Sequence, residues 1–411
     1  MSASGKLPID TATWLTTYAE SEEVLRTPAF LQAGKTESAS LIGGTVLTLD
    51  GEMHTASRRR LSRLVGRPAL MRYESEILSP TISRALTRLE SRRGADGVVR
   101  ADLVDTVRRI FLQIAAEIIG LGRLSSEDDE RELLRELYLF IDGSTVEWSR
   151  RSHSEVLAEA NAAREAFDTR FFSVAWAKKL QQVKDVHDGK ASETGLSADL
   201  LTIFALHALG NEVAVREGAI REAILFLVAS TLNNAGLVTN MLDELEVWNR
   251  DHPDKCLDLA DKKVFQSVVD ETLRLHPPAP AIVRMASEQI TIASGQSFNT
   301  GDIVALDLMK ANQDPEAYGA DANRFNPMRT IPNRARPYGL AFGAGSHVCL
   351  GQPLVTMARG GDGSEGSVGA QFKVMTALLN AGVRRDPSHP PITAASSQDR
   401  YDNYPVIFER L

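Results

Sequence analysis

The segment Phe342–Gly351, with the sequence FGAGSHVCLG, limits the possible folds of this chain most because it surrounds one cysteine with glycines. Gly343, Gly345 and Gly351 allow backbone conformations and close approaches that a Cβ atom would block. The residues after Gly351 are able to start a helix, and a helix N-terminus lowers the energy of a nearby thiolate. We therefore expect Cys349 to be a buried thiolate that binds a metal, not a surface nucleophile.

The spacing F-x-x-G-x-H-x-C-x-G in this segment resembles the haem-binding loop of the cytochromes P450. The resemblance implies that Cys349 is the axial ligand of haem b, that Phe342, Gly343 and Gly351 lie against the cofactor, and that His347 contacts a haem propionate. It also implies a mainly α fold with small β-sheets, in which haem lies between a long central helix and the cysteine loop. We expect one such domain over residues 1–411, with a short N-terminal region.

The composition is that of a globular protein and argues against several classes of function. Of the 411 residues, 43% are hydrophobic and 24% are charged, and 46 basic against 54 acidic residues give a net charge of −8. This acidic balance argues against nucleic-acid binding, which usually needs a basic face. Cys256 and Cys349 are too few for a disulfide framework and suit a reducing compartment. Because residues 1–10 have no apolar run, we expect a cytoplasmic protein without a membrane anchor.

A basic segment at Gly51–Leu61 places His54 and Arg58 four residues apart, and therefore on one helical face. Taken alone, such a segment favours a solvated basic helix. The resemblance implies that these two side chains contact the haem propionates. The other arginines of the segment fit a solvated face or a face that docks an acidic electron-transfer partner, such as a ferredoxin with its ferredoxin reductase.

A long helix is predicted over Glu217–Asn249, because its centre, Ile224–Ala229, is apolar on all sides. It resembles the central P450 helix that crosses the distal face of haem. That helix usually carries an acid followed by an alcohol, which help to deliver protons. Here Leu232 stands at the acid position and Asn233 at the alcohol position.

Leucine cannot carry a proton, and asparagine is a poor general acid although its amide can form hydrogen bonds. The distal candidates are therefore Ala229, Ser230, Thr231, Asn233 and Asn234, together with ordered water or a substrate hydroxyl. We expect Asn233 to lie over the haem. Asn234 fits a structural role at a helix bulge equally well.

The predicted helix Lys262–Leu275 contains Glu271 and Arg274, which are three residues apart on one face. The resemblance implies that Arg324 joins them in a buried network on the thiolate side. The chain after this helix is expected to be extended, and the resemblance makes Arg284 a third propionate partner.

Periodicity predicts the remaining elements. Helices are expected over Ser75–Arg92, Asp102–Leu121, Glu127–Ile141 and Ala198–Leu209, and strands over Thr11–Tyr18, Gln289–Ile292, Ile303–Leu306 and Tyr401–Leu411. The two strands near residue 300 are expected to form a small sheet. A flexible glycine-rich insertion is predicted at 360–369. The aromatic residues Trp148, Phe167, Phe171, Phe172 and Trp176 are candidates for a substrate pocket or for ordinary packing.

Three functions fit this sequence. The first is monooxygenation of a small organic substrate, such as a secondary metabolite, with electrons from a ferredoxin. The second is haem-thiolate chemistry without the usual acid–alcohol pair, namely peroxide-driven oxidation, isomerisation or dehydration. The third is haem binding without catalysis.

Overall fold

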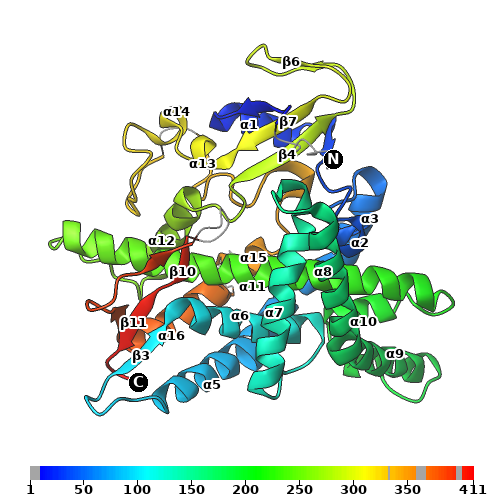
Figure 1. The fold of residues 1–411 in the computed structure, drawn as a ribbon, viewed down its shortest axis with the longest axis horizontal. Coiled ribbons are helices and arrows are strands. Elements are labelled where there is room, and N and C mark those ends of the chain that lie inside the picture. Colours follow the sequence, from blue (N-terminus) through cyan, green and yellow to red (C-terminus); the bar gives the residue numbers. More distant parts are fainter. Residues whose placement is uncertain (1–9, 332–333, 358–366, 395–399) are drawn as a thin grey trace. The chain divides into compact units, whose positions relative to one another are not determined.

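The computed structural model describes residues 10–331, 334–357, 367–394 and 400–411. It is mainly α-helical with small β-sheets, which confirms the predicted fold class (Figure 1). The chain divides into two compact units. Among the described residues, unit 1 comprises 10–11, 32–73 and 111–231, and unit 2 comprises 12–31, 74–110 and the described part of 232–411. The insertion predicted at 360–369 lies outside the described residues, except for its last three.

Unit 1 is built from helices. Its elements are α2 (Ala39–Ile42), α3 (Gly51–Leu61), α4 (Arg67–Arg72), α7 (Glu127–Ser144), α8 (His153–Phe167), α9 (Ser173–His187) and α10 (Leu200–Ala205). A π-helical turn, Asp168–Phe172, joins α8 to α9 without a break. Two helices, α6 (Leu103–Ile119) and α11 (Glu212–Asp251), belong partly to each unit.

Unit 2 holds the remaining helices and most of the strands. Its helices are α1 (Tyr18–Arg26), α5 (Ser79–Glu90), α12 (Lys262–Leu275), α13 (Leu308–Ala311), α14 (Pro315–Tyr318), α15 (Gln352–Val355) and α16 (Gly369–Asn380). The predicted bounds of α12 are confirmed to the residue. Helix α1 begins where Thr17 Oγ1 accepts a hydrogen bond from the N–H of Glu20, and ends before Pro28.

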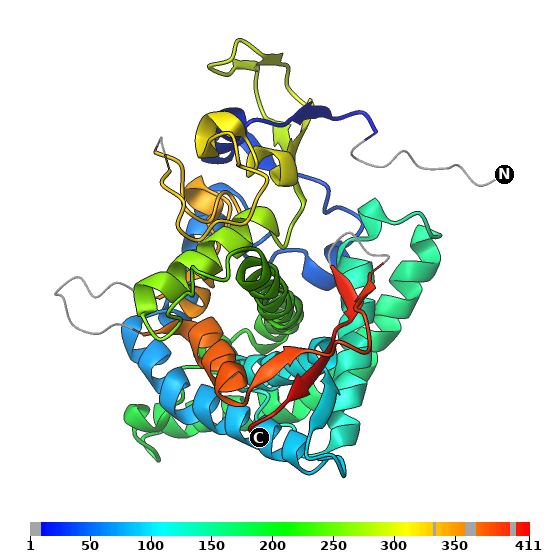
Figure 2. The same ribbon diagram turned by 90° about the vertical axis from the view of Figure 1, so that its left-hand side faces the viewer.

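The first sheet has four strands in the order β1-β7-β4-β2. Strand β7 (Ile303–Asp307) pairs in parallel with β1 (Thr13–Leu15) and antiparallel with β4 (Ala281–Ala286). Strand β2 is Phe30–Gln32. A second sheet pairs β11 (Pro405–Phe408) with β3 (Val99–Asp102) and β8 (Val383–Arg385), and Figure 2 shows β11 in red beside the cyan β3. The short β9 (Ile392–Thr393) pairs with β10 (Tyr401–Asn403).

One predicted strand pairing is wrong. Strand β5 (Ile290–Thr291) pairs with β6 (Ser297–Phe298) and not with β7. The reason is a tight turn at Gly295, whose φ is +87° and whose N–H donates to the carbonyl of Ile292 at 2.9 Å. This hairpin gives β5 a neighbour that begins six residues after β5 ends, so β7 is left to pair with β1 and β4.

Helix α11 is the longest described element, and it begins five residues before the predicted start. By length and composition alone it could cross a membrane, because one 18-residue window has a mean hydropathy of 1.3. However, 56% of that window is buried inside the protein, as in the core helix of a soluble protein. The apolar centre of α11 is therefore explained by packing.

Candidate functional site

The cysteine loop of unit 2 closes on itself through its backbone. The N–H of Cys349 donates to the carbonyl of Phe342 at 2.8 Å, and the N–H of Gly343 donates to the carbonyl of Leu340 at the same distance. Gly343 has a φ of +66°, which favours glycine. Phe342 is buried and meets the ring of Tyr338 edge-on at 5.1 Å. These contacts fix the backbone that carries the cysteine.

Gly345 shows why this loop needs glycine for space as well as for conformation. Its φ is +67°, and a Cβ atom there would lie 2.4 Å from the carbonyl oxygen of Leu25 and 2.9 Å from the Cα of Arg26. Any larger residue would push the loop away from the end of α1. The close approach therefore holds the cysteine loop against the first helix of unit 2.

Cys349 on this well-packed loop is exposed, so its side chain is accessible to a cofactor. A Cβ atom at Gly351 would be 3.8 Å from Sγ, an ordinary contact, so glycine keeps the space beside the sulfur open. The helix after the loop, α15, has only four residues, so its dipole adds little to thiolate stability.

This donor set fits haem. Among the described residues there is no group of three or more His, Cys, Asp or Glu that could hold a metal ion. One accessible soft thiolate would suit an iron whose other ligands come from a macrocycle. The open space beside Gly351 is compatible with such a flat group.

The predicted propionate contacts are distributed over both units. In unit 1, His54 and Arg58 lie one turn apart on α3, as expected from their spacing. His54 is 3% exposed, and its pKa is lowered by burial and by the charge of Arg58, although Asp50 opposes this. Burial and this charge therefore favour the neutral imidazole.

The other two predicted propionate contacts belong to unit 2. Arg284 is buried in β4, where one of its Nη1 hydrogens is donated to the carbonyl of Val283 at 3.0 Å. His347 is half-buried and ends the short 3₁₀ turn Gly345–His347, two residues before the cysteine. The structure therefore brings His347 and Cys349 together on one loop.

The central helix α11 presents its candidate residues in different ways. Ala229 and Asn233 are both exposed and lie one turn apart, whereas Thr231 and Leu232 are buried. Among the described residues, the Oγ1 of Thr231 has no hydrogen-bond partner. Ser230 donates its hydroxyl to the carbonyl of Phe226 on the preceding turn at 2.5 Å. Among the candidate residues of this helix, Asn233 thus has an accessible amide and Thr231 a buried hydroxyl.

Asn234 has a structural partner that the sequence did not identify. Its Oδ1 accepts a hydrogen bond of 2.8 Å from Nε2 of Gln371, a fully buried residue of α16. This contact matches the structural alternative for Asn234. Periodicity could not have found it, because 137 residues separate the two partners.

The network around Glu271 corrects another prediction. Glu271 and Arg274 form a buried bidentate pair with both N···O distances at 2.7 Å. The third member is Arg329, whose Nε donates to Glu271 at 3.1 Å, and not Arg324. Arg324 contributes only its backbone carbonyl, which accepts hydrogen bonds from Arg274 and Arg329. The sequence analysis missed Arg329.

Most of the aromatic pocket candidates pack in the interior of unit 1. Phe167 and Phe172 are fully buried, and Trp176 is 3% exposed. The rings of Phe172 and Trp176 stack 6.0 Å apart, and Phe140 meets Phe167 edge-on at 5.7 Å. These contacts match the packing alternative for these three residues. Trp148 and Phe171 are half-buried.

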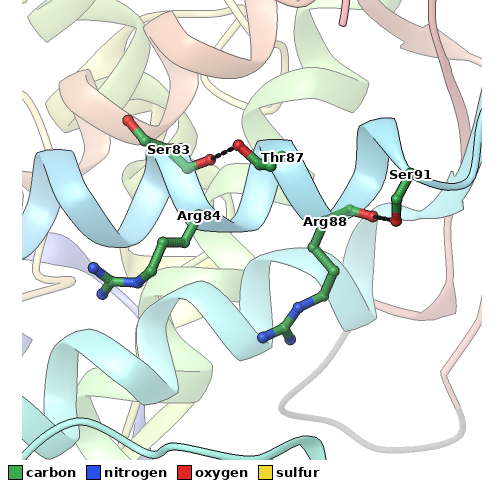
Figure 3. Close-up of a pocket in the computed structure, with 5 residues that line it drawn as sticks. All are labelled: Ser83, Arg84, Thr87, Arg88 and Ser91. Carbon is green, nitrogen blue, oxygen red and sulfur yellow. Dashed lines mark hydrogen bonds between the residues drawn. The ribbon is translucent and has the colours of Figure 1, made fainter.

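A surface depression on α5 does not contain any predicted site residue. It is lined by Ser83, Arg84, Thr87 and Arg88 of this helix and by Ser91 at its C-cap, and Figure 3 shows the two arginines directed to the same side. The hydroxyls of Thr87 and Ser91 donate to backbone carbonyls of their own helix. Since all its lining residues come from one helix and its C-cap, this depression is not a candidate active site.

The comparison with protein families identifies the chain. Residues 238–358, which include the Glu271 network and the cysteine loop, match the family model described as Cytochrome P450. The chain belongs to the cytochrome P450 family. Its cofactor is accordingly haem b with an axial cysteine thiolate, and it is an oxidoreductase of the haem monooxygenase type.

Relatives of this P450 include enzymes of known reaction. The C-19 steroid 1alpha-hydroxylase of Sorangium cellulosum is 25% identical over 381 residues, which are 90% of this chain and 83% of the relative. The cyclomarin C epoxidase CymV of Salinispora arenicola is 25% identical over 325 residues, or 78% of this chain and 72% of the relative. P450s of this kind act on small organic substrates with redox partners.

Solved P450 structures share the fold. P450BioI, crystallised in complex with an acyl carrier protein ligated to hexadec-9Z-enoic acid, superposes with a TM-score of 0.70. The alignment covers 96% of this chain and 92% of that chain at 20% identity. The likeness at this identity concerns the fold alone.

Proposed function

We propose that Cys349 is the axial ligand of haem b and that this P450 monooxygenates a small organic substrate. The observation that supports this most is the exposed sulfur of Cys349 on a loop whose backbone is fixed by Phe342 and Gly345. The other cysteine, Cys256, is exposed in the connection between α11 and α12 and has no such loop around it. Thiolate-ligated haem supplies the oxidising chemistry, and the protein supplies binding and orientation.

Four side chains are proposed to hold the haem propionates. The cations Arg58 and Arg284 would pair with the two carboxylates, and His54 and His347 would donate hydrogen bonds from a ring N–H. Burial and Arg58 lower the pKa of His54 and so favour the neutral imidazole, which still has one ring N–H to donate. Phe342, Gly343 and Gly351 would lie against the ring and leave room for it.

On the distal side we assign the accessible role to Asn233 and a supporting role to its neighbours. The amide of Asn233 is exposed and can orient a substrate or a water by hydrogen bonding, but it cannot be a general acid. Ala229, one turn earlier, presents only a methyl group and leaves space. The buried Thr231 hydroxyl and the Ser230 hydroxyl are proposed to hold water. Asn234 is assigned to structure because of its bond to Gln371.

The relatives guide the choice of substrate and partner. Because their names include a steroid hydroxylase and an epoxidase of a natural product, we propose an apolar secondary metabolite as substrate. Electrons are proposed to come from a ferredoxin and its reductase in the cytoplasm. The two units are proposed to be parts of a single domain, since α6 and α11 run through both.

The ligand assignment is tested by spectroscopy with a matched pair of variants. The reduced, carbon monoxide-bound protein is expected to show the red-shifted Soret band of thiolate-ligated haem. Cys349→Ser is expected to abolish this band, whereas Cys256→Ser should keep it at full intensity. Loss of the band in Cys256→Ser alone would transfer the ligand role to Cys256.

A second candidate is a P450 that does not depend on a dioxygen proton relay, such as a peroxide user, an isomerase or a dehydratase. The observation in its favour is the buried Leu232 at the position of the usual acid. Turnover of a substrate that shifts the haem spectrum should be compared with peroxide and with O₂ plus reductant. Turnover with peroxide alone would favour this second function, and turnover with O₂ and reductant would favour the first.

A further inference from the structure

A buried carboxyl group on α11 contacts the turn that leads into α3. Glu222 is 1% exposed, and its two oxygens accept hydrogen bonds from the N–H of Val46 at 3.4 and 3.3 Å. Val46 belongs to the turn Gly43–Asp50, which connects α2 to α3. The neighbouring Arg221 donates from Nη1 to the carbonyl of Gly43 at 3.1 Å. Two consecutive residues of α11 therefore hold this turn, which we call the 43–50 turn.

The internal hydrogen bonds of the 43–50 turn are local. The N–H groups of Thr48 and Leu49 donate to the carbonyl of Thr45, and the Thr45 hydroxyl donates to the carbonyl of Ile42. At the far end, Asp50 accepts a hydrogen bond of 3.1 Å from the N–H of Gln32. These contacts shape the turn but do not join it to α11. That connection depends on Glu222 and Arg221.

The 43–50 turn leads directly to the proposed haem contacts on α3. The carbonyl of Asp50 accepts the first helical hydrogen bond from the N–H of His54, at 3.3 Å. Arg58 follows one turn later on the same face. A shift of the turn therefore moves the start of α3 and the side chains of both residues.

We propose that Glu222 is a positioning residue that holds α3 in place through the 43–50 turn, and that ionisation of its carboxyl loosens this hold. The proposal rests on the proposed function, in which His54 and Arg58 contact haem. It adds a control over those contacts from a residue that touches neither haem nor substrate.

The charges around Glu222 explain why its protonation changes near neutral pH. Burial raises the pKa of Glu222 to about 7, although the Val46 N–H and the charge of Arg60 on α3 act in the opposite direction. Arg60 lies over the ring of Phe204, 4.6 Å from its centre, and makes no ion pair with Glu222. On α11 itself, Arg221 pairs with Glu217 at 2.8 Å.

The remaining neighbouring charge comes from α8. Arg164 of that helix also pairs with Glu217, at 2.7 Å, so both arginines are engaged there. Within the described part of the chain, an ionised Glu222 would therefore be a buried anion with one backbone donor and no ion pair. Opening of the turn would let water hydrate it.

The direction of the pH effect on turn opening follows from the pKa of Glu222 in the closed and in the open turn. With the turn closed the pKa is about 7, and with the turn open it returns to the ordinary value of 4.5. Opening therefore becomes more favourable as pH rises through this window and levels off above it. Between pH 6 and pH 8 the opening equilibrium is expected to increase about tenfold.

Hydrogen exchange of the haem-loaded protein tests this directly. In a peptide that covers the 43–50 turn, exchange corrected for its intrinsic pH dependence should be about tenfold faster at pH 8 than at pH 6. Glu222→Gln keeps an acceptor for the Val46 N–H but cannot ionise, so its corrected exchange should be equal at both pH values. Glu136→Gln, which changes another buried carboxyl of unit 1, should keep the tenfold difference.

A haem-loss assay separates this proposal from the proposed function. The rate of haem transfer to an acceptor protein should rise with pH in the wild type and stay flat in Glu222→Gln, whereas His54→Ala should lose haem faster at both pH values. If His54→Ala retains haem like the wild type while exchange of its 43–50 turn still depends on pH, the role of His54 is rejected. The effect of Glu222 on the turn would then still stand.

Other results overturn the proposal itself. The proposal is wrong if hydrogen exchange in Glu222→Gln still depends on pH. It is also wrong if the rate of haem loss does not change with pH in parallel with exchange of the 43–50 turn. Should the Gln variant not fold, Glu222→Asp has a carboxyl that is one methylene shorter and is expected to lose protection at both pH values. Unchanged protection in Glu222→Asp would equally reject the proposal.

Discussion

Arg329 donates from Nε to Oε1 of Glu271 at 3.1 Å, and this contact completes the buried pair formed by Glu271 and Arg274. The side chain of Arg329 is 6% exposed, and its remaining hydrogens are donated to Tyr318, Asp321 and the carbonyl of Arg324. The carboxylate of Glu271 is therefore shared between two guanidinium groups. Removal of either arginine would leave a buried charge with fewer partners.

The first prediction compares the two arginines of this region. Arg329→Ala is expected to lower the free energy of unfolding by about 3–5 kcal/mol, because it breaks a buried charge network. Arg324→Ala should change it by less than about 0.5 kcal/mol, because its side chain is exposed and only its backbone is used. Urea denaturation of the haem-loaded variants measures both values. If Arg324→Ala destabilised the protein more than Arg329→Ala, Arg324 would be the third member of the network.

The sequence could predict the Glu271–Arg274 pair but not its third partner. Both residues lie on a regular helix, where a spacing of three places them on one face. Arg329 follows an irregular segment, in which Asn326 accepts a hydrogen bond from the N–H of Met328 and donates its own N–H to Glu271. Such a segment has no period, so the direction of each side chain depends on tertiary contacts.

The second prediction separates the two asparagines of α11. Asn234→Ala is expected to lower the free energy of unfolding by about 1–2 kcal/mol, since it removes the hydrogen bond from the buried Gln371. Asn233→Ala should change it by less than about 0.5 kcal/mol, because the residue is exposed. Denaturation midpoints provide the comparison. Equal destabilisation by both variants would show that Asn233 is structural as well.

A substitution of Asn233 is also expected to change turnover. Asn233→Thr restores a hydroxyl at the position that we assign to the distal side, and it is expected to change the fraction of electrons that ends in product. The haem content should stay the same. A parallel loss of haem and product in this variant would contradict the assignment of Asn233.

Helix α11 shows what an apolar sequence pattern can predict and what it cannot. The apolar run Ile224–Ala229 predicts a buried helix, and the helix is present. Adjacent residues on a helix point about 100° apart, so the two asparagines face different neighbours. Which of them is exposed depends on α16, whose Gln371 bonds to Asn234. Local periodicity contains no information on that distant contact.

The third prediction concerns two glycines of the cysteine loop. Gly345→Ala is expected to destabilise the protein by about 2 kcal/mol or more, since its φ is positive and its Cβ would lie 2.4 Å from the carbonyl of Leu25. Gly351→Ala should keep the stability of the haem-free protein within about 0.5 kcal/mol, because its Cβ meets only the sulfur, at 3.8 Å. Thermal unfolding of the haem-free proteins measures both effects.

The haem affinity of the same variants tests the open space beside the sulfur. If that space receives the haem, Gly351→Ala should weaken haem binding several-fold without a loss of stability. Gly345→Ala, with a positive φ of +67° and a close contact with Leu25, serves as the control that affects the fold of the loop. Unchanged haem affinity in Gly351→Ala would show that the haem does not need this space.

The cysteine loop shows which part of a site a glycine pattern can predict. The glycines predicted a tight loop with a fixed backbone, and the structure has one. Burial of Cys349 stays a prediction, because it depends on what else covers the side chain. Leu25 lies against the loop at Gly345, and Tyr338 contacts Phe342.

The final prediction uses Glu136 of α7, a carboxyl group that the proposed chemistry does not need. It is fully buried, and neither of its oxygens has a hydrogen-bond partner among the described residues. Burial and, to a smaller extent, the charge of Glu132 raise its pKa to about 8, while Arg135 and Arg170 act against the shift. The native state therefore holds this proton up to a higher pH than the unfolded chain does.

The sign of the pH dependence follows from this raised pKa. Between the unfolded value of 4.5 and about 8 the native state binds more protons, so the contribution of Glu136 to stability falls as pH rises through that window. Glu136→Gln has nearly the same shape without the charge. We expect it to be about 2–4 kcal/mol more stable than the wild type at pH 9 and to differ by less than about 1 kcal/mol at pH 5.

A neighbouring residue of the same helix provides the control. Glu132 pairs with Arg135 near the surface at 2.6 Å, so Glu132→Gln should change stability by less than about 0.5 kcal/mol at either pH. Urea denaturation at pH 5, 7 and 9, with haem content checked at each pH, measures all three proteins. If the wild type and Glu136→Gln lose stability in parallel between pH 5 and pH 9, Glu136 is not the group that holds the proton.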